Sequence, residues 1–371
     1  MGCVAAAWAP GSPLVPLNGG HPGGDVRWAW LFVACESAAF GCYLGGLWLL
    51  RRGGRLAVVF ALAAAIQLAP LGAPLLLSTD AWTYWSYARV ANPYRDTPSS
   101  DPVSERWVGT AWRDTTSVYG PAFSLASEPL GLTRSHDLAA WAYKSAAAAA
   151  MLAATALAAR LSRRRAFAAA FVGWNPLLAI HFAGGGHNDA LMMALVAAAL
   201  ALGSSGRRHA AGVAWALAAL VKWVPLVLLP LRALEARATG RRVSHLGFAV
   251  TVGVVALAAT AAYGLDWLHF LGPLARNANH ETRFSLPHRT GLPWWAFAAA
   301  FALAYALLLR EAARGRARLG LAAGLLLLAV PYLAAWYAVW AVPLAAAEDD
   351  HTAQLLALGL CAYLLTQAVP V

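Results

Sequence analysis

The sequence has little charge of either sign and almost no lysine. Only 12% of its 371 residues are charged, whereas 60% are hydrophobic. A chain of this composition is expected to be a polytopic membrane protein. The two lysines, Lys144 and Lys222, both lie in apolar segments, where a charged side chain is costly to bury and commonly functional.

The sequence also gives no indication of a disulfide framework, a cleaved signal peptide or a nucleotide-binding unit. There are only four cysteines, and Cys35, Cys42 and Cys361 lie in apolar segments, so no disulfide framework is indicated. Residues 1–25 have no basic stretch ahead of an apolar one, which argues against a cleaved signal peptide and predicts a short disordered lead. The chain also lacks a Gly-rich nucleotide-binding unit.

Arginine clusters carry the net charge of +11 and lie between the apolar runs. This pattern follows the positive-inside rule, so it indicates membrane topology rather than nucleic-acid binding. The clusters at residues 51–55, 160–165 and 314–318 are therefore predicted to face the cytoplasm.

Between these clusters, hydropathy predicts one all-α domain over residues 1–371 with about ten or eleven transmembrane or re-entrant helices. The first three spans are predicted at about residues 28–50, 56–77 and 137–159, and the fourth ends at Gly184. Prolines blur the boundaries around residues 209–235 and 331–350. A broken or re-entrant hairpin is the interpretation of the first of these regions.

The same topology places two long loops on the extracytoplasmic face, at residues 78–136 and 264–291. The turn that contains Gly184, Gly185 and Gly186 followed by His187, Asn188 and Asp189 is predicted to share that face. Long polar loops on a membrane protein commonly carry its function. The active site is therefore expected on this side.

Asp80 is the most informative residue, because an apolar run ends there and a cluster of aromatic residues begins. An acid placed where a membrane helix meets water is commonly a positioned chemical group. The alternative is that it caps the following helix, since Ser78, Thr79 and Asp80 are all good N-cap residues.

The chemistry available outside the membrane suggests a role for Asp80. Nucleotide sugars are absent there, so a sugar transferase would need a lipid-carried donor such as a polyprenyl-phosphate sugar. Its phosphate leaves readily when cations and hydrogen bonds meet the developing charge, so no strong general acid is required. One carboxylate then takes the proton from the acceptor hydroxyl. A single base without a covalent intermediate predicts inversion, and no cofactor is expected.

Other polar residues are candidates for substrate contacts. His187 and Asp189 either bind sugar hydroxyls or tune the base, or they form a satisfied polar turn. Lys222 is the candidate partner of the donor phosphate, with snorkelling to the interface as its alternative. For Lys144 snorkelling is the preferred interpretation.

The two outer loops supply further candidates. Arg113 and Asp114 either contact the substrate or pair within their loop. Arg283 and His288, together with His280 and Arg289, either clamp the phosphate or face lipid headgroups.

Residues 348–351 have the composition of a metal site, Glu-Asp-Asp-His. Four consecutive ligands would diverge at a helix start, so a solvated turn and an N-cap are predicted there, and no metal is expected.

Four segments carry a resemblance to a known family: residues 78–89, 112–121, 175–192 and 218–225. In order and spacing they resemble the GT-C glycosyltransferases, and most closely the bacterial polyprenol-phosphomannose-dependent α-1,6-mannosyltransferases of lipomannan assembly. The resemblance covers roughly residues 56–235. Where relatives often show Pro-Trp-Tyr near the C-terminus, this chain has Ala335 before Trp336 and Tyr337.

This resemblance implies a multi-pass enzyme of the bacterial plasma membrane, with its active site on the extracytoplasmic face. It implies mannosyl transfer from polyprenyl-phosphate mannose to a glycolipid or glycan hydroxyl, with Asp80 as the catalytic base. It also implies substrate-binding roles for six residues beyond the polar candidates named above: Tyr84, Arg89, Tyr119, Asn188, Trp336 and Tyr337.

Two alternatives stay open on the sequence alone. One is the same chemistry with another polyprenyl-phosphate sugar, such as a pentose. The other is a lipid-carrier flippase or transporter, which a polytopic architecture would also permit. Against a transporter, the polar residues gather at the outer lip rather than at the midplane, and no inverted repeat is visible.

Overall fold

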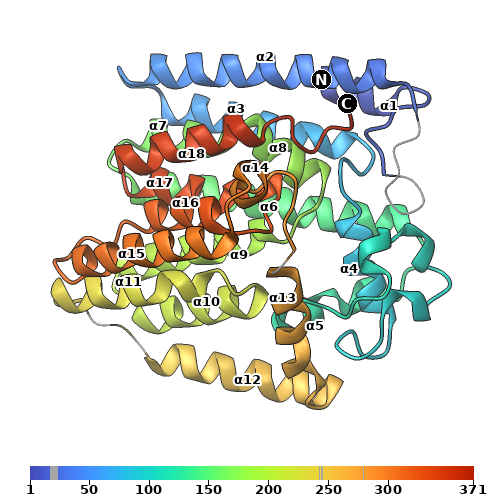
Figure 1. The fold of residues 1–371 in the computed structure, drawn as a ribbon. Coiled ribbons are helices and arrows are strands. Elements are labelled where there is room, and N and C mark those ends of the chain that lie inside the picture. The colour runs from blue at the N-terminus through green and yellow to red at the C-terminus, as the bar shows by residue number, and fades with distance from the viewer. Residues whose placement is uncertain (17–23, 242, 244, 279) are drawn as a thin grey trace.

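The computed structural model describes residues 1–16, 24–241, 243, 245–278 and 280–371. These described residues form helices joined by loops and no strand, which confirms the predicted all-α class. Figure 1 shows α2 along one edge of the molecule, α12 along the opposite edge, and α6 and α9 in the layer between them.

The helices follow one another along the chain in two halves. The N-terminal half contains α1 (Gly2–Trp8), α2 (Val26–Leu50), α3 (Leu56–Leu68), α4 (Asp80–Arg89), α5 (Pro121–Gly131), α6 (His136–Leu161), α7 (Arg165–Gly173), α8 (Pro176–Ala179) and α9 (Asp189–Ser204). The C-terminal half contains α10 (Arg208–Val221), α11 (Pro225–Ala238), α12 (His245–Tyr263), α13 (Leu271–Ala278), α14 (Leu286–Thr290), α15 (Trp294–Ala312), α16 (Leu319–Ala329), α17 (Val342–Ala347) and α18 (His351–Leu364).

Helix α6 is the central element, and its small side chains explain why. It packs against α7, α9 and α17, and it buries Ala147, Met151, Ala154 and Ala158 along one face. Residues three and four apart lie on the same side of a helix, and small residues there let neighbouring backbones approach closely. The alanine-rich sequence of α6 is thus a packing surface.

Among the described residues, four helices are long and apolar enough to cross a membrane: α2, α6, α12 and α15. The segments 165–173 and 176–184 would form a fifth span, bent by 51°. Helices α2, α12 and α15 bury little of their surface inside the protein, as expected of helices that face lipid. The predicted count of ten or eleven segments stays a prediction.

The first and third predicted spans lie within two residues of α2 and α6, but two other predicted spans are interrupted. The second, expected over residues 56–77, ends at Leu68 and continues as a 3₁₀ turn to Gly72, because Pro70 and Pro74 cannot continue the helical hydrogen bonds. The fourth bends after Gly173, because Pro176 starts a new helix that the Asn175 side chain caps.

Two other expectations change. The lead predicted as disordered over residues 1–25 is helical at Gly2–Trp8 and packs against α2 through Ala6 and Ala7; residues 17–23 lie outside the described ones. The loop 78–136 is built from α4, α5 and three 3₁₀ turns. The short apolar faces that stabilise these elements are too irregular to show a clear period in the sequence.

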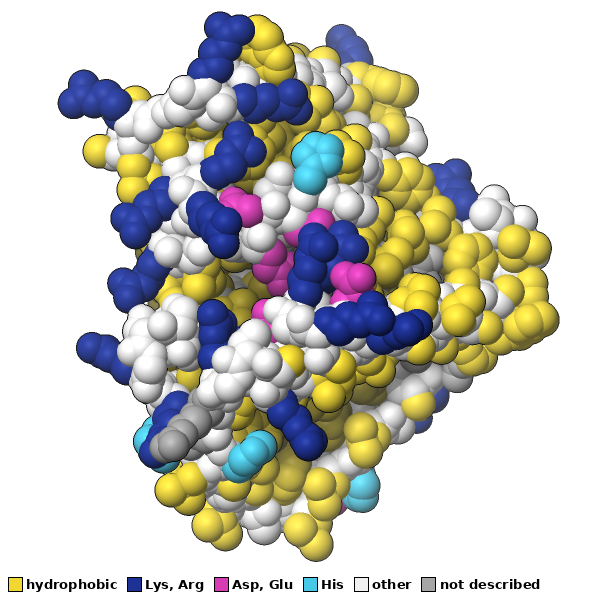
Figure 2. Space-filling view, turned by 90° about the vertical axis from the view of Figure 1, so that its left-hand side faces the viewer, with side chains coloured by type: hydrophobic (Ala, Val, Ile, Leu, Met, Phe, Trp, Pro, Cys, Tyr) yellow, Lys and Arg dark blue, Asp and Glu magenta, His cyan; other side chains and the backbone are white. Residues whose placement is uncertain are grey.

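The arginine clusters predicted to share one face do lie at one end of the molecule. Arg160 donates to the Ser205 hydroxyl at 3.0 Å, and the Arg163 backbone N–H donates to Asp349 at 2.8 Å. Arg318 pairs with Asp350 at 2.6 Å. Figure 2 shows this end, with arginines spread over it around a few acidic side chains. That the end faces the cytoplasm stays a prediction.

The acidic segment at this end forms the predicted turn and N-cap, but the prediction that it is solvated is wrong for Asp350, which is buried and paired with Arg318. Asp350 accepts hydrogen bonds from the backbone N–H groups of Thr352 and Ala353 at the start of α18. Glu348 accepts from the N–H groups of Leu319 and Gly320 at 2.7 and 2.9 Å, and so caps α16.

The packing of α6 gives a first prediction. Ala154 is fully buried, so Ala154→Leu should overpack the layer and lower the free energy of unfolding by about 1 to 3 kcal/mol. The control is Ala156→Leu on the exposed side of the same helix, which should change little. Thermal unfolding in detergent measures both, and equal losses would contradict a close-packed α6.

Candidate active site

Helix α4 is buried, and aromatic packing holds it in place. Tyr84 lies edge-on to Tyr119 and Phe123, with ring centroids 4.9 Å apart in each pair, and to Tyr143 at 5.3 Å. Trp82, Trp85 and Tyr87 of this helix are also buried. Edge-to-face pairs of this kind stabilise the fold by more than the burial of their apolar area alone. The aromatic cluster that follows Asp80 therefore fixes the start of α4.

Asp80 is the first residue of α4, and its carboxylate meets His187 from a distant segment. The distance between Asp80 Oδ2 and His187 Nδ1 is 3.0 Å. The Tyr84 hydroxyl lies 3.4 Å from the same oxygen and also accepts the backbone N–H of Asn188 at 3.4 Å. The Thr79 side chain at the N-cap of α4 makes no capping hydrogen bond, whereas the Ser78 hydroxyl accepts the backbone N–H of Asp80 at 3.1 Å.

The surroundings of Asp80 keep it ionised. Burial alone would raise the pKa of its carboxyl, but the hydrogen bond and charge interaction with His187 and the charge of Lys222 lower the pKa below its usual value. Burial, together with the nearby carboxylates of Asp80 and Asp189, raises the pKa of the Tyr84 hydroxyl, so that hydroxyl stays protonated. At neutral pH the Asp80 carboxylate is thus ionised, the form in which a carboxylate can accept a proton.

His187 is held from both sides. Its ring stacks on the Trp336 indole with centroids 3.7 Å apart and planes 12° apart, and the residue is fully buried. Gly186, which precedes it, has φ +73°, a conformation that other residues rarely adopt. This turn aims the imidazole at Asp80, and Trp336 keeps it there.

A second buried carboxylate, Asp189, binds Lys222. The Lys222 ammonium donates to both carboxylate oxygens at 2.8 Å, and the Trp340 indole N–H donates to Oδ1 at 2.6 Å. The ammonium also lies 4.7 Å from the centre of the Tyr337 ring. Asp189 is fully buried, so its oxygens are committed to these donors.

Lys222 reaches this point because α10 ends there. Lys222 is in an extended conformation after Val221, and Pro225 starts the next helix. The outer loop crosses this end of α10 at Gly120, whose N–H donates to the Val221 carbonyl at 3.2 Å. A Cβ atom on Gly120 would lie 2.0 Å from the Leu220 carbonyl oxygen, so only glycine permits the approach.

These elements line a cavity of about 140 Å³. Among the described residues that line it, Asp80 is the only acidic residue and Lys222 the only lysine or arginine. The rest of the wall is mainly aromatic and aliphatic, and includes Tyr119, Trp336 and Tyr337. A cavity with a few convergent polar groups on an apolar wall is typical of a ligand site, and flat aromatic rings suit the apolar faces of sugars.

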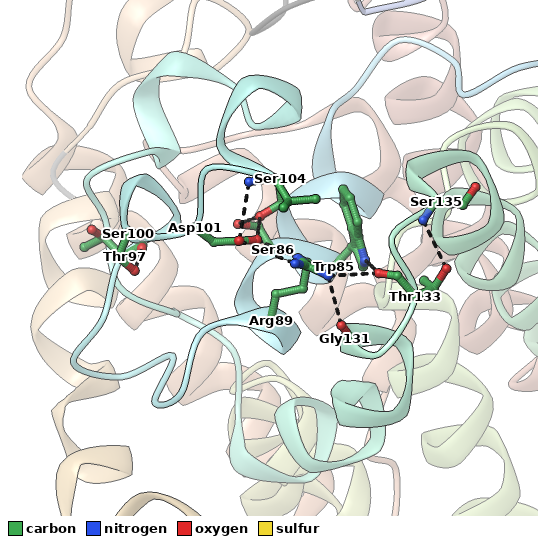
Figure 3. A network of polar contacts seen from close by, with 11 residues as sticks. Trp85, Ser86, Arg89, Thr97, Ser100, Asp101, Ser104, Gly131, Thr133 and Ser135 are labelled. Carbon is green, nitrogen blue, oxygen red and sulfur yellow. Dashed lines mark hydrogen bonds and ion pairs between the residues drawn. The ribbon is translucent and has the colours of Figure 1, made fainter.

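Arg89 lies away from this cavity. Its guanidinium pairs with Asp101 at 2.5 Å and donates to the carbonyl oxygens of Gly131 and Thr133 at 3.2 and 3.0 Å. Figure 3 shows this network, in which the Ser104 hydroxyl also donates to Asp101 at 2.6 Å. In this structure Arg89 ties the outer loop to the turn that follows α5.

The other predicted loop residues are also outside the described lining of the cavity. The Arg113 guanidinium donates to the Val108 carbonyl at 3.2 Å, while Asp114 is exposed. Arg283 donates to the Gln367 carbonyl at 3.1 Å, and His288 is exposed on α14. Their substrate contacts stay predictions.

The structure adds aromatic residues that the sequence analysis did not single out. Trp112, Trp223, Tyr332 and Trp340 line the cavity. Because the chain has 17 tryptophans and most of them could be interfacial anchors, no local signal marks these. Lys144, for which snorkelling was preferred, is buried instead and donates to the carbonyl oxygens of Leu71 and Pro74 at 3.4 and 3.3 Å.

The buried Lys222–Asp189 pair gives a second prediction. Lys222→Met leaves Asp189 charged and buried, and the loss of one partner of such a pair typically lowers stability by about 3 to 5 kcal/mol. Lys222→Met combined with Asp189→Asn removes both charges and should regain most of that loss. Thermal unfolding in detergent measures the difference.

Arg27→Met is the matched control, because Arg27 pairs with Asp25 through a side chain that is 87% exposed and should contribute little. If the single and the double variant at Lys222 were equally unstable, the charge pair would not be what holds this region together.

Comparison with known proteins shows which family the chain resembles. The family described as alpha-(1->6)-mannopyranosyltransferase, N-terminal domain, matches residues 26–237. The chain is 30% identical over 239 residues to "Alpha-(1->6)-mannopyranosyltransferase A" of Mycobacterium tuberculosis, covering 57% of this chain and 46% of that protein. It is 27% identical over 217 residues to a Mycolicibacterium smegmatis protein named "Probable alpha-(1->6)-mannopyranosyltransferase", covering 55% and 36%.

The chain thus spans less than half the length of these curated relatives. No solved structure gives a significant match. The family match includes Asp80, His187 and Lys222 but ends before Trp336. Because that match covers more than half of the sequence, the chain belongs to the alpha-(1->6)-mannopyranosyltransferase family.

Proposed function

We propose that the protein is a membrane glycosyltransferase that transfers a mannosyl residue from polyprenyl-phosphate mannose to a hydroxyl of a glycolipid or glycan. The observation that carries this proposal is the cavity in which one ionised carboxylate and one ammonium are set on an aromatic wall. Family membership supports mannose as the sugar and α-1,6 as the linkage. The chemistry is then a direct displacement at the anomeric carbon, which inverts its configuration.

Asp80 is the general base of this reaction. Its side chain is 15% exposed and opens on the cavity, whereas that of Asp189 is fully buried. Only the first of these carboxylates can therefore reach an acceptor hydroxyl. His187 holds the carboxylate in position and favours its ionised form.

Lys222 meets the donor phosphate. Two of its three ammonium protons are directed at Asp189, and the third remains for a phosphate oxygen in the cavity that Lys222 lines. A cation at this place stabilises the negative charge that develops as the phosphate leaves. The paired Lys222→Met and Asp189→Asn protein should accordingly fold and yet use the donor poorly.

The mechanism predicts the effect of one isosteric change. Asp80→Asn keeps the size of the side chain but removes the proton acceptor, and loss of a general base typically lowers the rate by about 10²- to 10⁴-fold. The measurement is sugar transfer from synthetic polyprenyl-phosphate mannose to a mannoside acceptor in liposomes, with thermal unfolding as the folding control.

Asp137→Asn is the matched variant, since that side chain is 84% exposed at the start of α6. It should transfer at the wild-type rate. A well-folded Asp80→Asn protein with near wild-type transfer would exclude Asp80 as the base, and a wild-type protein inactive with every polyprenyl-phosphate sugar would refute the transferase proposal.

We propose that the active site faces the extracytoplasmic side of a bacterial plasma membrane, because α4 lies at the end of the molecule opposite the arginine clusters (Figures 1 and 2). In a background without native cysteines, Asp114→Cys and Arg283→Cys should react with an impermeant thiol reagent in intact cells. Arg163→Cys and Arg314→Cys should react only after the cells are opened. All four positions are exposed in the structure, so the reverse labelling pattern would invert the orientation.

A further inference from the structure

A second cavity of about 310 Å³ lies at the arginine end of the molecule. Residues of α9, α10 and α11 and the first turn of α12 line it, together with Arg241 and Val243 from the connection between α11 and α12. Its lining shares no residue with that of the Asp80 cavity. Along α10 the lining extends from Arg208 to Trp215, so the seven residues from Trp215 to Lys222 separate the two cavities by about 10 Å at 1.5 Å per residue.

The lining combines an apolar wall with several cations. Trp215, Leu229 and Phe248 belong to the wall, whereas Arg208, Arg232 and Arg241 bring three guanidinium groups. Arg232 is paired with Glu235, and neither Arg208 nor Arg241 has an ion-pair partner among the described residues. The cavity therefore carries unbalanced positive charge next to apolar surface.

This combination selects for a ligand that is both anionic and apolar. Guanidinium groups bind phosphate oxygens through paired hydrogen bonds. An apolar wall favours a bound hydrocarbon chain, because the contact removes the apolar surface of both from water. A free phosphate would use only the first property, and a neutral lipid only the second.

The cavity also borders the surface that faces lipid. Helix α12 supplies His245 and Phe248 to the lining, and farther along it exposes Leu246, Val250, Val254 and Leu257 at 65%, 54%, 60% and 73%. Their spacing of four, four and three residues forms one apolar stripe on the helix. A lipid whose headgroup entered the cavity could lay its chains along this stripe.

We propose that this cavity binds the phosphate-bearing headgroup of a membrane lipid, at a site separate from the transferase centre. Arg208 and Arg241 contact the phosphate from two sides of the cavity, and Arg232 adds a third cation. The neighbouring wall covers the glycerol or the first methylene groups. Basic pockets between helices near one membrane surface are suited to anionic headgroups in this way.

The test measures binding to the purified full chain by native mass spectrometry. The probes are phosphatidylglycerol, undecaprenyl phosphate, phosphatidylcholine and inorganic phosphate. The variant Arg208→Glu with Arg241→Glu reverses two exposed charges that line the cavity. Arg163→Glu with Arg314→Glu makes the same change in net charge on exposed residues at the same end but outside the cavity, and thermal unfolding checks that both variants fold.

The cavity variant should bind phosphatidylglycerol or undecaprenyl phosphate at least tenfold more weakly than the wild type, while the control stays within twofold. Whichever of these two lipids shows the loss identifies the source of the phosphate. Equal losses in both variants would mean a diffuse charge effect and would overturn the site. Binding of inorganic phosphate as tight as that of the lipids, or binding of phosphatidylcholine unchanged from that of the anionic lipids, would overturn it as well.

Discussion

The hydrogen bond between Asp80 and His187 joins the start of α4 to the turn before α9, two segments 107 residues apart. Much of the site depends on it. The Gly186 turn, the stacking of Trp336 on His187 and the aromatic packing of Tyr84 all restrict where these two side chains can lie. A carboxylate with one exposed edge is thereby held in a single orientation at the wall of a cavity, which is what a positioned base requires.

The two buried acids of the site have different roles because their partners differ. Asp189 is fully buried and is satisfied by Lys222 and Trp340, so it anchors the lysine. Asp80 shares its charge with an imidazole and keeps an exposed edge. In a chain with only 12% charged residues, one carboxylate thus positions a cation and the other remains available for chemistry.

The sequence predicted the all-α class and the boundaries of α6 correctly, because each depends on a local signal. Asp80 was selected as the candidate base from a local signal too, and that role stays a proposal. An apolar run that ends in Asp80, and three glycines before His187, are visible without a structure. The pairing of Lys222 with Asp189 was not predicted as a pair, because it depends on how α9 and α10 pack across 33 residues. Arg89 shows the same limit, since its ion pair with Asp101 forms only when the outer loop folds back. Bends at proline were anticipated near Pro225 but not at Pro176, where the preceding apolar run gave no sign of a break.

The configuration of the transferred sugar at its anomeric carbon tests the proposed mechanism without any substitution in the protein. The proposed mechanism has Asp80 as its one base, and the residues described as lining the cavity include no second carboxylate, so it predicts direct displacement. Nuclear magnetic resonance of the product made from a donor of known configuration reads this outcome. Inversion is expected in every product molecule; a product that retains the configuration of the donor would contradict a single-base displacement at Asp80.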